Sequence, residues 1–182
     1  SYDASSLAQA IIDGGCDAIM LMSYATDGAA IMEALSAQGF TGSIIGADGV
    51  ADSAFTDAFT DVTAVDGLTA TRPRPGQNST AKTNFESAYA AAGGAEGAIY
   101  TGETYDAIKI AAAAIILDLD TGLKAAVSKT GRMYNGASGS HTFDSNGDVL
   151  GTGYEVCQFD GTDFSCPQVW TADTGLSGQA GL

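Results

Sequence analysis

The feature that most constrains the fold of this sequence is a regular alternation of helical and strand segments over residues 1–71. The apolar run Asp17–Met22 is short and follows two glycines, which favours a parallel strand buried on both faces. Apolar residues at helical spacing precede it in Asp3–Asp13 and follow it around Ile31 and Leu35. Each strand candidate is therefore flanked by helices, as in a sheet with crossover connections.

Two further strand candidates, Ser43–Ile45 and Gly67–Thr71, continue the alternation, with a short helix expected at Ala54–Phe59 between them. This order predicts an α/β fold with a three-layer arrangement, in which right-handed crossover helices pack on a parallel sheet. The chain has 182 residues, 45% of them apolar, which is enough for a real core.

The pattern changes at Arg72–Gly76, where two prolines and a glycine predict a crossing segment. Helices are expected next at Thr80–Ala92, Thr104–Leu119 and Leu123–Thr130, with no strand between them. In the second helix, five residues at helical spacing are expected to form the packed face: Tyr105, Ile108, Ala112, Ile115 and Leu119. Either these helices form a small bundle, or the sheet that they cover lies outside this sequence.

The C-terminal region alternates apolar and polar residues in Thr142-Phe143, Tyr154–Phe159 and Phe164–Trp170, which predicts antiparallel strands. Turns are expected at Asn146-Gly147 and Asp160-Gly161. The last residues, 171–182, are rich in glycine and are expected to be flexible.

Three cysteines are present. If a hairpin turns at Asp160-Gly161, Cys157 and Cys166 lie opposite each other, and a cross-strand disulfide is possible. Such a bond fits an oxidising compartment. Cys16 opens an apolar strand and is expected to be buried.

The charge balance is strongly acidic, with 22 acidic and 7 basic residues and a net charge of −15. Nucleic acid is not expected as a partner, because phosphate-binding surfaces need clustered Lys and Arg. The single histidine, His141, is expected in a surface loop. We find no motif for a catalytic residue, a metal site or a cofactor, so no enzyme is predicted.

The loops after the first two strands are the best candidates for a ligand site. Tyr24 follows the strand Asp17–Met22, and Asp48 follows the strand Ser43–Ile45. In open α/β sheets, ligands bind outside the carboxyl ends of the strands. A carboxylate beside an aromatic ring can receive an ammonium group. The alternative is structural: Tyr24 lies half-buried at the rim, and Asp48 only turns its loop.

At these residues the sequence resembles a known family, the periplasmic branched-chain amino acid binding proteins, which are substrate-binding components of ABC importers. The resemblance is carried by GGCDAIMLMSYATDGAAIMEALSAQGFTGSIIGADGV, then TRPRPG, TGETYDAI and YNGASGSHTFDSNGDVLGTGYEV. It implies a two-lobed type 1 periplasmic binding fold that closes on an amino acid. It also implies that Tyr24 and Asp48 contact the ligand, with Asp48 holding the ammonium group.

The resemblance covers only the C-terminal half of the family. It implies a partial ligand-binding lobe at 1–71 and 142–170, the helical portion of the other lobe at 72–141 without its sheet, and a flexible tail at 171–182. The groups that hold the ligand carboxylate would lie mainly in the missing N-terminal half.

The expected partners are a small-molecule ligand, that missing half and the membrane subunits of an ABC importer, in the periplasm or outside the cell. A sensor domain of the same fold, or a structural protein with an idle pocket, remain alternatives.

Overall fold

The computed structural model describes residues 3–65, 67–76, 78–95, 98–117, 122–149, 151, 153–160 and 164–178. The chain divides into two compact units. The first, which we call the sheet unit, comprises Ser1–Arg74 and Gly153–Leu182, and the second, the helical unit, comprises Pro75–Thr152. None of the described helices combines the length and apolarity of a membrane span.

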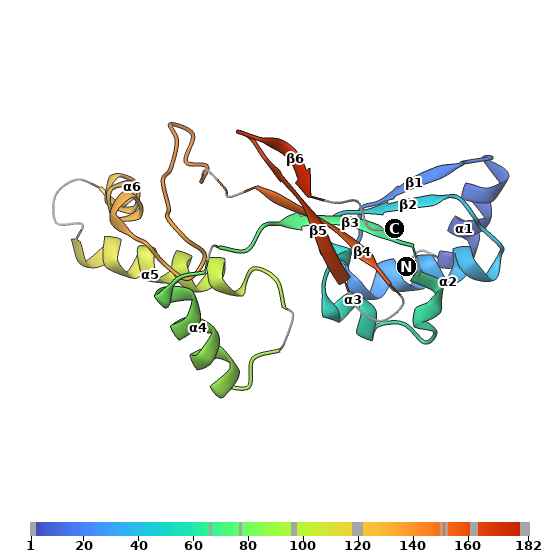
Figure 1. Cartoon of the computed structure of the whole chain (residues 1–182), viewed down its shortest axis with the longest axis horizontal. Helices are drawn as coiled ribbons and strands as arrows, with labels where there is room; N and C mark the ends of the chain where they lie inside the picture. Colours follow the sequence, from blue (N-terminus) through green and yellow to red (C-terminus); the bar gives the residue numbers. More distant parts are fainter. Residues whose placement is uncertain are drawn as a thin grey trace. The chain divides into compact units, whose positions relative to one another are not determined.

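The sheet unit contains a six-stranded sheet in the order β1-β2-β3-β4-β5-β6 (Figure 1). β1 to β3 are parallel, and β3 to β6 are joined by antiparallel pairs. The predicted α/β class, with antiparallel strands at the end of the chain, is therefore confirmed. The strands are β1 (Ala18–Leu21), β2 (Ser43–Gly46), β3 (Thr69–Pro73), β4 (Tyr154–Phe159), β5 (Phe164–Thr171) and β6 (Gly175–Gly178).

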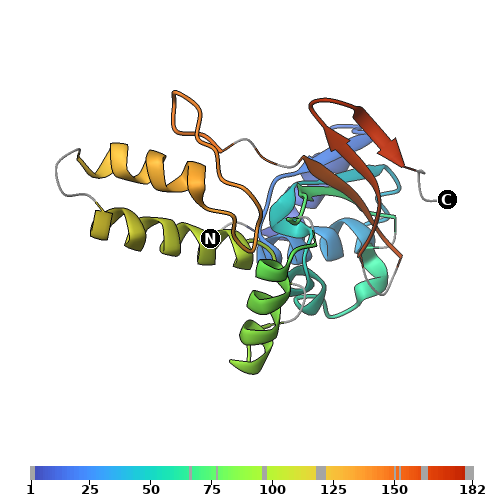
Figure 2. The same ribbon diagram turned by 60° about the vertical axis from the view of Figure 1, so that its left-hand side comes forward.

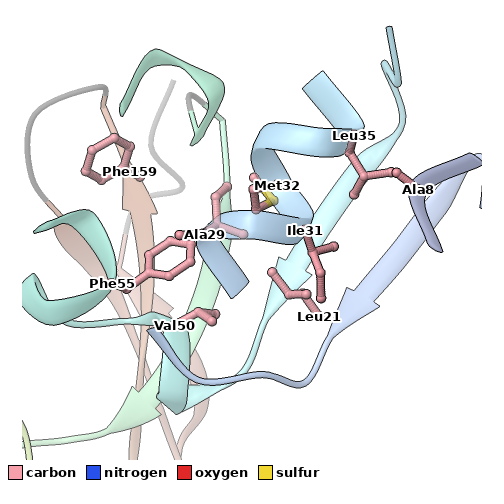
Figure 3. Close-up of a cluster of buried hydrophobic side chains, with 10 residues drawn as sticks. Ala8, Leu21, Ala29, Ile31, Met32, Leu35, Val50, Phe55 and Phe159 are labelled. Carbon is pink, nitrogen blue, oxygen red and sulfur yellow. The ribbon is translucent and has the colours of Figure 1, made fainter. Parts of the chain in front are cut away.

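Among the described residues, this unit has three α-helices: α1 (Ala4–Asp13), α2 (Ala25–Ala37) and α3 (Ser53–Asp57). Asp3 and Asp52 cap α1 and α3, because each carboxylate accepts a hydrogen bond from a first-turn amide. Residues of all three helices share one buried cluster with side chains of β1 and β4 (Figure 3). Phe55 of α3 lies there beside Val50 and Ala29. The described helices of this unit therefore pack on one face of the sheet.

On the other face of β1 the side chains are exposed, which corrects the prediction that Asp17–Met22 is buried on both faces. Leu21 is buried, but its neighbour Met20 is 64% exposed, because successive side chains of a strand point to opposite faces. Cys16 was also predicted to be buried, and it is exposed with a free thiol. Its place at the end of the turn after α1, outside β1, explains this exposure.

The helical unit contains α4 (Thr80–Ala91), α5 (Thr101–Leu117) and α6 (Leu123–Met133). α5 and α6 pack side by side (Figure 2), and α4 meets α5 where the rings of Phe85 and Tyr105 lie 5.0 Å apart. The packed face of α5 was predicted wrongly. Ile108 and Ile115 are each 64% exposed, whereas Asp106, Ile110 and Ala114 are buried.

The unit boundaries also differ from the predicted ones. Residues 142–149 belong to the helical unit, where Phe143 and Val149 form a single antiparallel bridge. The predicted flexible tail contains the last residue of β5 and the strand β6, which pairs with β5. Gly161 of the predicted hairpin turn lies outside the described residues.

Candidate functional site

The candidate site lies where β1 and β2 end. The parallel register pairs Leu21 with Gly46, so the two strands end level with each other. The amide of Ala47 donates a hydrogen bond to the carbonyl of Leu21 at 3.2 Å, which ties the second loop to the end of β1. Tyr24 is the residue that precedes α2, and Asp48 begins the short 3-10 helix Asp48–Val50.

The two loops touch at Gly49. A Cβ atom at this position would lie 2.4 Å from the carbonyl oxygen of Ser23 and 3.0 Å from Cδ1 of Tyr24. Only glycine allows this approach, since both distances are shorter than ordinary contacts. The structure thus brings the backbone beside Asp48 against the loop that carries Tyr24, as the order of the strands predicted.

The two side chains differ in their surroundings. The side chain of Tyr24 makes no capping hydrogen bond to α2, and the residue is 81% exposed. Asp48 is half-buried, at the start of a helical turn that continues into the buried residues Val50 and Ala51. The exposed ring of Tyr24 therefore lies against the backbone of Gly49, the residue that follows Asp48.

A third residue near the carboxyl ends of these strands was not predicted from the sequence: Arg72, near the end of β3. Its Nε donates to Oε2 of Glu155 at 3.0 Å, and its Nη1 donates to the carbonyl of Ala51 at 3.2 Å. Ala51 is fully buried and follows directly after the helical turn that Asp48 begins. The guanidinium therefore links β3 and β4 to the loop that carries Asp48. We call this arrangement the Arg72 clamp.

Replacing Arg72 with alanine should loosen this loop and lower the free energy of unfolding by about 2 kcal/mol, because the buried carbonyl of Ala51 loses a charged donor. Hydrogen exchange should become faster at the amides of Val50 and Ala51. Arg72→Lys should recover only part of the loss, because an ammonium group cannot form both bonds in the geometry of the guanidinium. Unchanged exchange in Arg72→Ala would contradict the clamp.

The helical unit contains the only buried charged residue among those described, Asp106 of α5, which is 0% exposed. Its Oδ1 accepts hydrogen bonds from the amide of Ala137 at 2.9 Å and the hydroxyl of Tyr134 at 3.3 Å. Its Oδ2 accepts from the amide and the hydroxyl of Ser138, both at 2.7 Å, and lies 3.1 Å from Nε2 of His141. One carboxylate therefore anchors the loop after α6.

Burial by itself raises the pKa of Asp106, but the hydrogen bonds from Ser138, His141 and Ala137 outweigh it and hold this pKa below its usual value. His141 lies in a loop, as predicted, but it is half-buried instead of lying on the surface. The group is not a nucleophile arrangement, because Ser138 donates its hydroxyl proton to Oδ2 of Asp106. Its Oγ also lies 3.3 Å from Nε2 of His141, but this is the same nitrogen that faces the carboxylate.

Sequence reasoning missed Asp106, although one signal was available. Asp106, Ile110 and Ala114 follow each other at intervals of four residues, so they share one helix face. The predicted face with Ile108 and Ile115 is a different one, and both residues are exposed.

In the sheet unit, Cys157 and Cys166 form a disulfide between β4 and β5. Together with Glu155 they make a group of metal-ligand type within 4.8 Å. Sulfur atoms joined in a disulfide carry no thiolate charge for a metal ion, so this group does not suit one.

A scan against models of known protein families and a search of curated proteins find no match. Solved structures do match. The chain is similar to the leucine binding protein LivK of Thermotoga maritima MSB8, with a TM-score of 0.74 and 26% identity. It is also similar to the substrate binding protein LivJ of Streptococcus pneumoniae, in complex with isoleucine, with a TM-score of 0.69 and 18% identity. A type 1 periplasmic binding protein of Bordetella pertussis Tohama I matches with a TM-score of 0.68 and 19% identity.

These matches cover most of this chain and about half of each relative. The covered shares are 95%, 90% and 87% of this chain, against 50%, 47% and 48% of the three solved structures. The fold is thus that of type 1 periplasmic binding proteins, and the resemblance seen in the sequence to branched-chain amino acid binding proteins is confirmed. The chain spans about half the length of the structures that it matches.

Proposed function

Since the chain has the fold of type 1 periplasmic binding proteins, we propose that it is part of an exported protein that binds a small solute and delivers it to an ABC importer. The observation that carries this proposal is the similarity over 95% of the chain to a leucine binding protein. The neighbours are binding proteins, and such proteins act by closing two lobes on a ligand without chemical change. The proposal accordingly assigns no catalytic residue.

We propose an amine-bearing ligand, an aliphatic or branched-chain amino acid, held by Tyr24 and Asp48. A carboxylate forms charge-assisted hydrogen bonds with an ammonium group, and the adjacent ring attracts the cation with its face. The close contact at Gly49 between the two loops supports this pairing. The pair forms one wall of a site, and the groups for the ligand carboxylate would come from the rest of the two-lobed fold.

This division of roles predicts what the 182-residue chain binds by itself. We expect L-leucine to bind only weakly, with a Kd on the order of millimolar, because one wall gives few contacts. Isoamylamine, which keeps the ammonium group, should bind about as well, and 4-methylpentanoate, which lacks it, should not bind. Chemical shifts followed by NMR during titration should move at the amides near Tyr24 and Asp48.

Two variants make the test specific. Asp48→Asn should abolish the shifts caused by isoamylamine, whereas the control Asp57→Asn, an exposed acid on α3, should leave them unchanged. A Kd in the micromolar range for the chain alone would refute the need for a second wall. Shifts that avoid both loops would refute the site itself.

A further inference from the structure

The helical unit carries a sequence motif that the proposed function does not use. Asn78-Ser79-Thr80 has the form Asn-x-Thr, which oligosaccharyltransferases recognise for N-linked glycosylation. The other asparagines have no serine or threonine two positions later: Asn84, Asn135 and Asn146. The motif therefore distinguishes Asn78 from every other asparagine of the chain.

The structure places this motif where an enzyme can reach it. Asn78 lies in a bend ahead of α4, and both Asn78 and Thr80 are exposed. Ser79 between them has an extended backbone, with φ −146° and ψ 161°. A three-residue match has meaning only on an exposed loop of an exported protein, and the surface position meets the structural part of this condition.

The backbone on both sides of Asn78 is held in place. After it, the hydroxyl oxygen of Ser79 accepts a hydrogen bond from the amide of Lys82 at 3.1 Å and caps α4. Before it, Gly76 is buried, and a Cβ atom there would lie 2.5 Å from the carbonyl carbon of Ser138. Asn78 is thus an exposed residue between two anchored positions. A glycan on its side chain can extend into solvent without displacing a packed group.

We propose that Asn78 is an acceptor for an N-linked oligosaccharide in the exported protein. The donor is an oligosaccharide that is joined to a lipid through a diphosphate. Nδ2 of Asn78 forms a bond to C1 of the first sugar, the bond between C1 and the diphosphate oxygen breaks, and the lipid diphosphate leaves. The amide gives one proton to a base of the transferase, and no atom is oxidised or reduced. This inference rests on the proposed export and not on a ligand at Tyr24 and Asp48.

The test secretes the whole 182-residue chain from yeast behind a cleavable signal sequence. This host supplies both the export step and the oligosaccharyltransferase. The secreted chain should carry one N-linked glycan, which peptide N-glycosidase removes while it converts Asn78 to aspartate. When the enzyme acts in heavy-oxygen water, the aspartate is labelled, and mass spectrometry of the peptide locates the site.

Three variants and a control make the test specific. Asn78→Gln should abolish the glycan, and Thr80→Ala should do the same although it keeps the acceptor amide. Thr80→Ser keeps the hydroxyl group and should retain glycosylation. The matched control is Asn84→Gln, which replaces an exposed asparagine of α4 outside the motif and should leave the glycan unchanged.

A variant that does not fold would also lack a glycan in the secreted material. Folded wild-type chain is therefore also incubated with purified oligosaccharyltransferase and its lipid-linked donor. The same peptide should gain the glycan, and Asn84 should stay unmodified.

Three results would overturn the proposal. A wild-type chain that gains no glycan, either in yeast or with the purified enzyme, would show that Asn78 is not an acceptor. A glycan that Asn78→Gln retains would lie at another residue. Unmodified Asn78 in the exported protein isolated from its source cells would show that the site is not used. All three are read from the mass of one peptide, whereas the proposed ligand site is tested by titration with amines, so the two proposals can fail separately.

Discussion

Replacing Asp106 with alanine should lower the free energy of unfolding of the helical unit by about 3 kcal/mol or more, because buried donors lose their acceptor. The amides of Ala137 and Ser138 both donate to this carboxylate, and no water can reach a residue that is 0% exposed. The loop after α6 would lose its anchor on α5. Asp106→Ala removes five hydrogen-bonding contacts of the carboxylate. Few other single substitutions in this chain should therefore lower the free energy of unfolding as much.

Urea denaturation of the whole chain, with hydrogen exchange at Ala137 and Ser138, measures this effect within the helical unit. Asp148→Asn is the control, because it removes an exposed acid from the same unit. Gly136→Ala tests the same packing from the other side, since a Cβ atom there would lie 2.2 Å from Oδ1 of Asp106. Wild-type exchange at both amides in Asp106→Ala would contradict the anchor.

The same carboxylate gives stability a predictable pH dependence. Its pKa is lowered in the folded state from the ordinary value of 3.8, so the folded state binds its proton less readily than the unfolded state. The contribution of ionised Asp106 to the free energy of unfolding is therefore complete above pH 3.8. It is lost as the pH falls through the lower pKa of the folded state. The difference in unfolding free energy between wild type and Asp106→Asn should shrink in that acidic range. A difference that is constant with pH would contradict an ionised Asp106.

Removing the disulfide between Cys157 and Cys166 should lower the free energy of unfolding of the sheet unit by about 2 to 3 kcal/mol. The bond closes a loop with a sequence separation of 9, and the entropy lost by the unfolded chain sets this magnitude. Cys157 of β4 is fully buried. Both cysteines are therefore replaced with alanine, Cys157→Ala with Cys166→Ala, so that no new polar group is buried.

Trp170 is a convenient probe for this measurement, because it is the only tryptophan and lies on β5, opposite Tyr154 of β4. Its fluorescence during urea unfolding should show a lower midpoint in the double variant and in the reduced wild type. The matched control is Cys16→Ser, which changes an exposed free thiol and should leave the midpoint unchanged. The same midpoint in oxidised and reduced wild type would contradict a stabilising bond.

The local pattern of residues predicted several elements well. Gly14 and Gly15 end α1 where expected, and Gly15 has a positive φ of 66°, which favours glycine. Alternation in Tyr154–Phe159 predicted β4 with the right bounds. The positions of Tyr24 and Asp48 at the strand ends also followed from chain order alone. These features depend on residues that are close to each other in the sequence, so the sequence alone is enough to predict them.

Other features depend on contacts between distant segments. Asp17–Met22 is as apolar as a strand buried on both sides, but only the packing of α1 to α3 on one face decides that Met20 is exposed. In the sequence, nothing distinguishes Arg72 and Asp106 from other charged residues. Arg72 pairs with Glu155, 83 positions away, and Asp106 pairs with Ser138, 32 positions away. Helical spacing predicted an inner face of α5 with Ile108 and Ile115, whereas the buried face carries Asp106, Ile110 and Ala114.

The sequence by itself therefore determined the order of helices and strands and the loops that carry the candidate site, because hydrophobic spacing and turn residues act over a few positions. Only the tertiary structure decided which face of each element is buried and which charged groups are paired. Burial is set by what packs on an element, and a buried charge is stable only where folding brings its hydrogen-bond partners to it.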